Sequence, residues 1–404
     1  MSLTADIGGF KEYKGPRINY SAEKITDDEF LIAPHALLFE KNISPQSISC
    51  FTSNIHKAFF KTIGDFPFDI FAASFYLLSR YEEYLPHQKD MYGRYDPQNS
   101  LAYKEGFVNQ PLINYWLKDL KTKLVKKFPS LATHNAQFSF VPSYDIDIAW
   151  SYRNKGMVRS IAGMFRALIK GNWQELKQRI SKKEKDPYDA YGWMNQLHEK
   201  YKIKPYYFFL VAEKTSKYDK NIPPGNKAMR ALIHDHAIRY PIGVHPSWRS
   251  GDEPGLLKKE IDSLSAITGN SIKSSRQHYI RFTLPETFRR LIDKGIQFDF
   301  SMGYGSINGF RASVASPFFW YDLEKEKQTT LLLFPFCYME ANSFYEQKVS
   351  AEQALEEMRN YYTAVKSVNG TFIMIWHNSF LGTDPLFAGW RDVFEKFIKE
   401  VTSK

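Results

Sequence analysis

From residue 136 onward, short apolar runs alternate with stretches in which apolar positions recur at helical spacing. Buried strands are predicted at Phe138–Ser143, Pro205–Ala212 and Pro241–His245, and helices at Asp189–Tyr201, Lys227–Arg239 and Pro254–Ile267. The alternation continues through a strand, a helix and a strand (Ile272–Phe282, Glu286–Asp293, Ile296–Met302), a strand pair around Thr329–Met339, then helix, strand and helix (Ala351–Ser367, Thr371–Asn378, Pro385–Val401). Such strand–helix units favour an α/β fold with a parallel sheet buried on both sides, either open or closed into a barrel.

The first 135 residues lack this alternation and are expected to form a separate, smaller α+β accessory domain. Helices are predicted at Phe68–Leu85 and Val108–Phe128, with a loop rich in Gly and Pro between them. Arg80, Glu82 and Glu83 are interpreted as exposed charges on the first helix. No catalytic constellation is found in this part, so the catalytic domain is expected at residues 136–404.

Composition supports a folded protein with a large core. The chain has 404 residues, of which 43% are hydrophobic and 16% aromatic, and this length is typical of two domains. Its two cysteines, Cys50 and Cys337, are too few for a disulfide framework or a cysteine-based zinc site. No apolar run reaches the length of a membrane span, and no secretory signal is found, so a cytoplasmic protein is expected.

Charge is spread unevenly along the chain. The 54 Lys and Arg exceed the 44 Asp and Glu, and residues 151–185 alone hold ten Lys and Arg against two Glu. Apolar residues recur there at helical spacing, which predicts a basic amphipathic helix or helix pair inserted in the catalytic domain. Such a segment either contacts an anionic membrane surface or anionic substrate, or packs one face on the protein with its charges solvated. No nucleic-acid partner is expected.

Titratable residues gather where the predicted strands end. Asp145 and Asp147 close the first strand, and being two apart they share one face, about 6–7 Å apart along the backbone. Because parallel strands place their carboxyl ends at one edge of the sheet, we expect the following side chains to meet there: Asp145, Asp147, His245, Arg276, His278 and His377. Two or three His and Asp ligands around an open position are typical of a catalytic zinc site, and a further carboxylate and histidine then supply a base and an acid.

Four stretches of the chain resemble the motifs of one enzyme family. SYDID, GVHPSW, SRQHY and IMIWHN are similar to motifs of the polysaccharide deacetylase (NodB-homology) superfamily, also called carbohydrate esterase family 4, over roughly Ala136–Lys404. The resemblance implies a distorted (β/α) barrel in which Asp145 is the base and Arg276 holds it ionised and in place. It further implies Asp147 and His245 as metal ligands and His377 as the acid. The N-terminal part is similar to a domain that accompanies a bacterial subset of these deacetylases.

The chain departs from the family pattern at one ligand position. The family usually has a second metal-binding His where this chain has Arg249. Either His278 substitutes as the third ligand or the metal is lost. With His278 in place, the cofactor implied is a divalent metal, zinc being the first expectation.

Three residues are predicted to contact the substrate. Residues 309–322 are expected to form a loop over the site, where Arg311 either binds a substrate anion or carboxylate or makes a structural ion pair. Trp248 and Trp376 are expected to line a sugar-binding groove, with apolar packing beneath the site as the alternative for Trp376 and its neighbouring aromatics.

The predicted function is metal-assisted hydrolysis of an N-acyl or O-acyl group on a carbohydrate, which could be anionic or lipid-linked. One alternative is a metal-independent C–N hydrolase that acts on a small substrate through the same Asp145 and His377. Another is a non-catalytic carbohydrate-binding relative. A glycoside hydrolase needs two opposed carboxylates, and Asp299 does not complete such a pair.

Overall fold

The structure, a computed structural model, describes residues 2–133, 136–156 and 185–403, together with single residues between 161 and 179. In this part of the chain, no helix combines the length and hydropathy that a membrane span requires.

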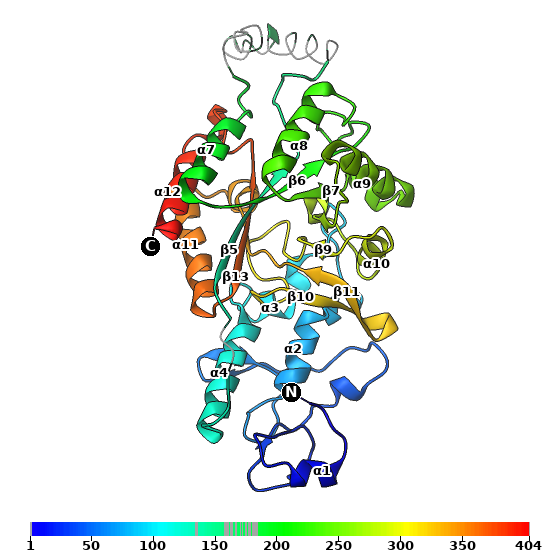
Figure 1. Ribbon diagram of the computed structural model, residues 1–404, viewed down its shortest axis with the longest axis vertical. Coiled ribbons are helices and arrows are strands. Elements are labelled where there is room, and N and C mark those ends of the chain that lie inside the picture. The colour runs from blue at the N-terminus through cyan, green and yellow to red at the C-terminus, as the bar shows by residue number, and fades with distance from the viewer. Residues whose placement is uncertain are drawn as a thin grey trace.

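A nine-stranded sheet forms the centre of the molecule (Figure 1). All of its pairings are parallel except β10 with β11. The spatial order is β10-β11-β9-β8-β7-β6-β5-β13-β12, and no pairing among the described residues joins β12 to β10. The strands are β5 (Ser139–Ile146), β6 (Tyr206–Leu210), β7 (Ile242–His245), β8 (Ser274–Ser275), β9 (Phe298–Asp299), β10 (Phe318–Asp322), β11 (Lys327–Leu333), β12 (Tyr338–Met339) and β13 (Thr371–His377). The predicted α/β class is confirmed, with a large sheet that hydrogen bonds leave open.

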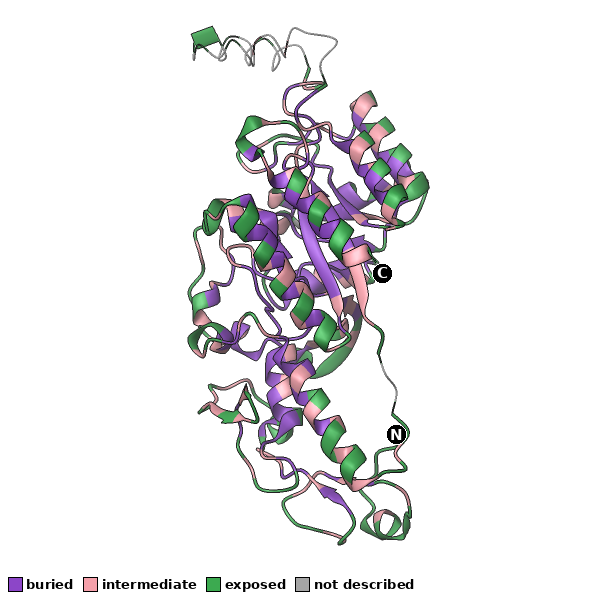
Figure 2. Ribbon diagram, turned by 90° about the vertical axis from the view of Figure 1, so that its left-hand side faces the viewer, coloured by how far each residue is buried: buried purple, intermediate pink, exposed green. Residues whose placement is uncertain are grey.

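Helices pack around this sheet (Figure 1). In Figure 1, α7, α11 and α12 lie at the left of the molecule, α8 lies above β6, and α9 and α10 lie at the right. Figure 2 shows buried residues along the strands and exposed residues on the outward faces of the helices. The helices are α7 (Tyr191–Tyr201), α8 (Lys227–Arg239), α9 (Pro254–Thr268), α10 (Glu286–Asp293), α11 (Ala351–Ser367) and α12 (Trp390–Thr402). The predicted bounds of α8, α10 and α11 are confirmed.

The N-terminal part packs against the sheet region through several contacts. The Ile113 amide donates to the Ser313 carbonyl at 3.0 Å, and the Phe75 and Tyr321 rings lie 5.1 Å apart. Its elements are short: α1 (Ile7–Glu12), β1 (Ile18–Asn19), β2 (Phe30–Leu31), β3 (Phe51–Ser53), β4 (His56–Ala58), α2 (Ile70–Leu78), α3 (Leu101–Lys104) and α4 (Leu112–Lys127). The division at residue 135 into two domains stays a prediction.

Arg80, Glu82 and Glu83 are buried rather than exposed, which corrects the sequence interpretation. The α-helix ends at Leu78, and Arg80 adopts a φ of 55°, which turns the chain inward. Glu83 accepts from Arg80 Nε at 2.7 Å and from both Arg311 Nε and Nη2, at 2.8 and 2.6 Å. Burial raises the pKa of Glu83, but the charges of Arg311 and Arg80 outweigh this and lower it to about 2. A buried ion pair therefore joins the N-terminal part to the segment after β9.

Two further predictions are wrong in the same region of the fold. The strand predicted at Ile272–Phe282 is reduced to β8, because the chain leaves the sheet through a turn at His278–Ile280 where Tyr279 and Ile280 have positive φ. The loop predicted at 309–322 is shorter than expected, because its last five residues form edge strand β10.

The predicted basic helical insertion, 151–185, lies in large part outside the described residues. Its two described ends are held together by the buried carboxylate of Asp186. This carboxylate accepts from the amides of Ser151, Tyr152 and Arg153 at 2.7 to 3.0 Å. The insertion therefore leaves the fold and returns to it at one point.

Candidate metal centre

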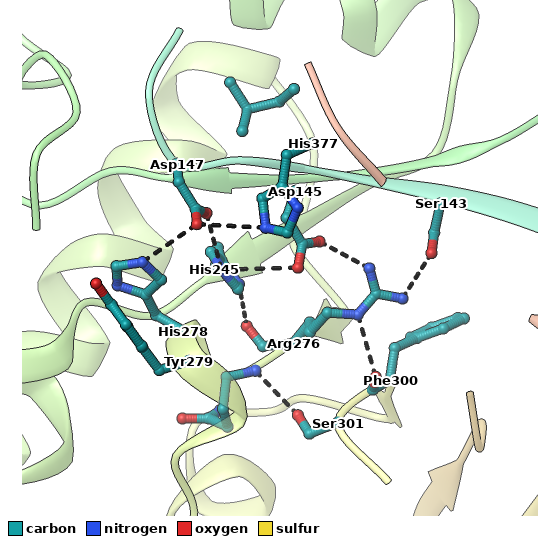
Figure 3. Close-up of polar contacts among 12 residues, drawn as sticks. Ser143, Asp145, Asp147, His245, Arg276, His278, Tyr279, Phe300, Ser301 and His377 are labelled. Carbon is teal, nitrogen blue, oxygen red and sulfur yellow. Dashed lines mark hydrogen bonds and ion pairs between the residues drawn. The ribbon is translucent and has the colours of Figure 1, made fainter. Parts of the chain in front are cut away.

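Adjacent strands bring the predicted site residues to one edge of the sheet. His377 pairs in register with Asp145 across β13 and β5, and His245 is the last residue of β7. Asp147 lies just beyond β5, while Arg276 and His278 follow β8. Figure 3 shows these side chains pointing toward one another, as the strand-end pattern predicts.

Asp147, His245 and His278 form the one group among the described residues that could hold a metal ion. One ligand atom from each lies within 4.8 Å of the others. His245 Nε2 is 3.1 Å from Asp147 Oδ1, and His278 Nε2 is 3.4 Å from Asp147 Oδ2 (Figure 3). The sequence left open whether His278 is the third ligand or the metal is lost. In the structure, His278 lies close enough to Asp147 and His245 to be the third ligand.

The partners of the two imidazoles fix which nitrogen faces Asp147. His245 Nδ1 donates to the Arg276 carbonyl at 2.6 Å, and His278 Nδ1 donates to Asp219 Oδ1 at 3.1 Å. Each Nε2 is then free to act as a ligand, which is the usual arrangement of metal-binding histidines. Asp147 Oδ1 is buried and makes no hydrogen bond within the described part of the chain, although His245 Nε2 lies 3.1 Å from it. A divalent cation fits these three donors.

The carboxylates of Asp147 and Asp219 favour a positive charge on or near the two imidazoles. Burial raises the pKa of Asp147, but His278 and His245 outweigh it and hold this pKa well below its ordinary value. Burial lowers the pKa of His278, but Asp147 and then Asp219 outweigh it and raise this pKa to about 9. Either protons on the imidazoles or a metal ion must therefore balance the negative charges of Asp147 and Asp219.

Asp145 lies beside the three ligands without being one of them. Its Oδ1 accepts from Arg276 Nη1 at 2.7 Å, while its Oδ2 is 3.8 Å from His245 Nε2. Arg276 is fully buried, and its other nitrogens donate to Ser143 Oγ at 2.7 Å and to the Phe300 carbonyl at 3.1 Å. The guanidinium is thereby fixed and orients the Asp145 carboxylate.

His377 lies on another side of Asp147 and has a partner that the sequence did not reveal. Its Nε2 is 3.5 Å from Asp147 Oδ2, and its Nδ1 is 2.7 Å from Oε1 of the buried Glu340. Burial lowers the pKa of His377, but Glu340 and the hydrogen bond with Asp147 outweigh it and raise this pKa well above its ordinary value. Glu340 directly follows β12, so its place after an apolar strand was a signal that could have identified it.

Of the three predicted substrate contacts, two are corrected. Trp376 is fully buried and its ring packs 4.6 Å from Phe394, so this residue belongs to the core. Arg311 is also buried and bound to Glu83, so it makes the structural ion pair instead of contacting a substrate. Trp248 is half-buried and stacks 4.0 Å from Tyr218, beside the site.

Asp219 and Asp299 complete the acids near these strand ends. Asp219, which the sequence analysis missed because it lies in a polar loop well beyond β6, supports His278. Asp299 is buried and accepts from Ser275 and Ser301 at 2.7 and 3.0 Å, and burial raises its pKa to about 6. Because both hydroxyls donate to the Asp299 carboxylate, Asp299 does not serve as the opposed acid that a glycoside hydrolase needs.

A family model and several solved structures are similar to this chain. Residues 1–129 match the model of a family of unknown function, DUF7033. No curated protein matches the chain at a significant level.

Three solved structures illustrate the similarity at the level of structure. A structure described as a polysaccharide deacetylase from Mycobacterium smegmatis is 12% identical with a TM-score of 0.45, over 68% of this chain and 86% of that one. A PuuE allantoinase is 10% identical with a TM-score of 0.44, over 68% and 89%. A CE4 family pseudoenzyme from Bacillus anthracis is 10% identical with a TM-score of 0.35, over 68% of both chains. Likeness at this level does not assign an activity to this chain.

Proposed function

We propose that the protein is a metal-assisted hydrolase that removes an N-acyl or O-acyl group from a carbohydrate. The observation that carries this proposal is the arrangement around Asp147. A carboxylate held by Arg276 lies on one side of the Asp147–His245–His278 group, and a histidine held by Glu340 lies on another. A base, an acid and a place for a cation are the three components of metal-assisted hydrolysis of an acyl bond.

The donor set suits zinc, with Asp147, His245 and His278 as the residues that would hold it. Such an ion supplies Lewis acidity, which polarises the acyl carbonyl and makes water a stronger nucleophile at neutral pH.

Asp145 is assigned the role of general base. It takes a proton from the attacking water as the oxygen adds to the acyl carbon, and the buried Arg276 keeps the carboxylate in position throughout. Asp145 is suited to this because one of its oxygens, Oδ2, is not engaged by the guanidinium.

His377 is assigned the role of general acid. As the bond between the acyl carbon and the sugar nitrogen or oxygen breaks, Nε2–H donates its proton to that leaving atom. Glu340 binds the opposite ring nitrogen and so keeps the proton-bearing Nε2 pointed into the site. Asp145 then releases its proton to solvent, and His377 takes one up from solvent.

The carbohydrate substrate is supported by the resemblance of SYDID, GVHPSW, SRQHY and IMIWHN to the deacetylase motifs.

The anionic or lipid-linked form of that substrate is supported by the basic insertion. Of its described apolar residues, five are 48% to 73% exposed: Ile161, Phe165, Leu168, Ile169 and Trp173. Side chains that exposed are not packed on the protein, which favours peripheral contact with an anionic membrane surface over a solvated brace. The cytoplasmic location stays a prediction.

A second candidate is a metal-independent C–N hydrolase acting on a small substrate. It is favoured by the three imidazoles that surround Asp147, because protonated His278 could balance its charge without a cation. Asp145 and His377 would keep the same roles. A non-catalytic carbohydrate-binding relative would need no acid–base pair at all.

Metal analysis combined with an assay of acetate release distinguishes these candidates. Purified full-length protein is tested on N-acetylated and O-acetylated oligosaccharides before and after chelation. The proposal predicts about one bound divalent ion per chain, acetate release, and loss of release on chelation. Release that survives chelation favours the metal-independent hydrolase, and absence of release from every substrate contradicts the proposal.

A further inference from the structure

The candidate metal ligand His278 is carried by a turn with an unusual backbone. The turn spans His278–Ile280, and its last two residues, Tyr279 and Ile280, have φ values of 59° and 55°. A left-handed φ is uncommon for residues with side chains, and for bulky or β-branched residues it persists only where other contacts hold it. Because Tyr279 directly follows His278 (Figure 3), a change in this turn would move the ligand.

The N-terminal part contacts this turn through Arg94. Arg94 Nη1 donates to the Tyr279 carbonyl at 3.1 Å and to the Gly305 carbonyl at 2.8 Å. Within the described part of the chain, the Tyr279 carbonyl accepts no other hydrogen bond. Because this carbonyl belongs to the peptide between the two left-handed residues, Arg94 opposes the rotation of that peptide by which the turn would relax.

Arg94 is itself fixed by its own loop. It is 5% exposed, and its Nε donates to Asp90 Oδ2 at 2.6 Å. Asp90 Oδ1 accepts from the amides of Tyr92 and Arg94 at 2.9 and 3.0 Å, and the guanidinium lies 4.7 Å from the Tyr92 ring centroid. A guanidinium that is buried and paired in this way has a defined position, and it therefore holds the Tyr279 carbonyl in a defined position as well.

A glycine at position 305 makes room for this contact. A Cβ added to Gly305 would collide with Arg94 Nη1 and would lie 2.8 Å from the Tyr279 carbonyl oxygen. Gly305 belongs to the segment after β9, so three separate stretches of the chain meet at the Arg94 guanidinium: the loop of the N-terminal part, the turn after β8 and the segment after β9. Packing this close leaves the turn little freedom to change while Arg94 is in place.

We propose that Arg94 is a positioning residue that places His278 for metal binding, so that the N-terminal part sets the metal affinity of the site. Asp219 orients the His278 ring through Nδ1, and Arg94 fixes the backbone that carries the ring. The inference rests on the proposed function for the presence of a metal ion. Residues 1–129, which match a family of unknown function, then have a role in completing the metal centre.

The test measures metal binding separately from turnover. The Zn²⁺ affinity of the full-length protein is measured by competition with a chromophoric chelator, and the visible spectrum of the Co²⁺-loaded protein reports the geometry of the ligands. Arg94→Gln removes the guanidinium and is expected to weaken Zn²⁺ binding about tenfold or more, as loss of a residue that supports a metal ligand does. Its Co²⁺ spectrum is expected to shift toward that of His278→Ala, in which the ligand itself is absent.

Asn114→Ala is the matched control, because Asn114 is a buried polar residue of the same N-terminal part and bonds the segment after β9 away from the turn. Its side chain accepts from the Ala315 amide at 2.9 Å and donates to Ser316 Oγ at 3.0 Å. Its Zn²⁺ affinity and Co²⁺ spectrum are expected to equal those of the wild type. Thermal unfolding of the metal-free proteins reports whether the fold is retained. If Arg94→Gln unfolds, Gly305→Ala, which displaces the guanidinium from the other side, is measured instead with the same expected loss.

The outcomes separate this inference from the proposed function. Unchanged Zn²⁺ affinity and an unchanged Co²⁺ spectrum in the folded variant overturn the inference, and acetate release by the wild type then leaves the proposed function standing. Weakened Zn²⁺ binding with a changed Co²⁺ spectrum, in a protein whose wild type releases no acetate, supports the inference and contradicts the catalytic proposal. An equal loss of affinity in Asn114→Ala, or no Zn²⁺ binding by the wild type, overturns the inference.

Discussion

At the scale of single residues, the proposed chemistry depends on side chains placed around Asp147 but not in the ligand set. Asp145 and His377 each have a dedicated partner, Arg276 and Glu340, that uses one atom of the group and leaves the other facing the site. This division of contacts makes the roles separable by mutation.

Asp145→Asn tests the base. The amide cannot accept the proton of the attacking water, so acetate release should fall by about 10²-fold or more. The bound metal should remain near its wild-type amount, because Asp145 is outside the ligand group. Elemental analysis and an acetate assay measure the two quantities, and a wild-type rate in this variant would remove Asp145 from the role.

Glu340→Gln tests the residue that orients the acid. The neutral amide loses the charged hydrogen bond to His377 Nδ1, so kcat should fall about tenfold or more while metal content is retained. Glu357→Gln is the matched control, since Glu357 contacts Ser343 and Gln347 instead. Equal kcat values for the two variants would mean that Glu340 does not support catalysis.

The site residues differ in how far the sequence could predict them. Asp145, Asp147, His245 and His377 lie at the ends of strands, so local pattern identified them. Asp219 could not be found in this way, because it reaches His278 from a loop, through a contact between residues 59 positions apart.

At the scale of elements, the long strands and amphipathic helices were predictable because their patterns are local. Strands β5 and β13 read as apolar runs and pair along seven positions. Elements whose form depends on distant contacts were not predictable. The helix expected to reach Leu85 ends early because Arg80 and Glu83 turn inward to meet Arg311, which lies more than two hundred positions away.

The basic insertion yields a prediction at this scale. Vesicles containing phosphatidylserine should bind the protein, and binding should weaken steeply between 50 and 500 mM salt as the Debye length falls toward a few ångströms. Replacing Arg159, Arg166 and Lys170 with Gln should reduce binding, and so should replacing the exposed Phe165 and Trp173. Sedimentation with neutral phosphatidylcholine vesicles is the control. Binding that neither salt nor these replacements alter would make the segment a structural brace.

At the scale of the whole molecule, stability should depend on pH through two buried histidines in the layer next to the sheet. His198 contacts the hydroxyls of Tyr144 and Tyr240 at 2.9 and 3.1 Å, and His236 bonds the Leu232 carbonyl at 2.8 Å. Burial lowers the pKa of His198 to about 3 and that of His236 to about 4. Both therefore stay neutral in the folded chain under conditions where the unfolded chain binds protons.

The sign of this effect follows from proton binding. Between the unfolded value near 6.5 and pH 4, the unfolded chain binds more protons, so the free energy of unfolding falls as pH falls. Each histidine contributes up to about 1.4 kcal/mol per pH unit in that window. The free energy of unfolding, measured by urea titration at pH 7, 6 and 5, should therefore change less steeply with pH in His198→Gln than in the wild type. His234→Gln, an exposed histidine on α8, should keep the wild-type slope, and equal slopes in all three proteins would contradict the account.

The most direct test of the central claim is the rate of acetate release from an N-acetylated oligosaccharide as Zn²⁺ is returned to metal-depleted protein. The proposed site predicts negligible release without metal and a rate that rises to a plateau at one equivalent per chain. In His278→Ala the plateau should be lost or shifted to much higher Zn²⁺, because one of the three ligands is missing. A depleted protein that releases acetate at its full rate, unchanged by added Zn²⁺, would contradict a metal-assisted hydrolase.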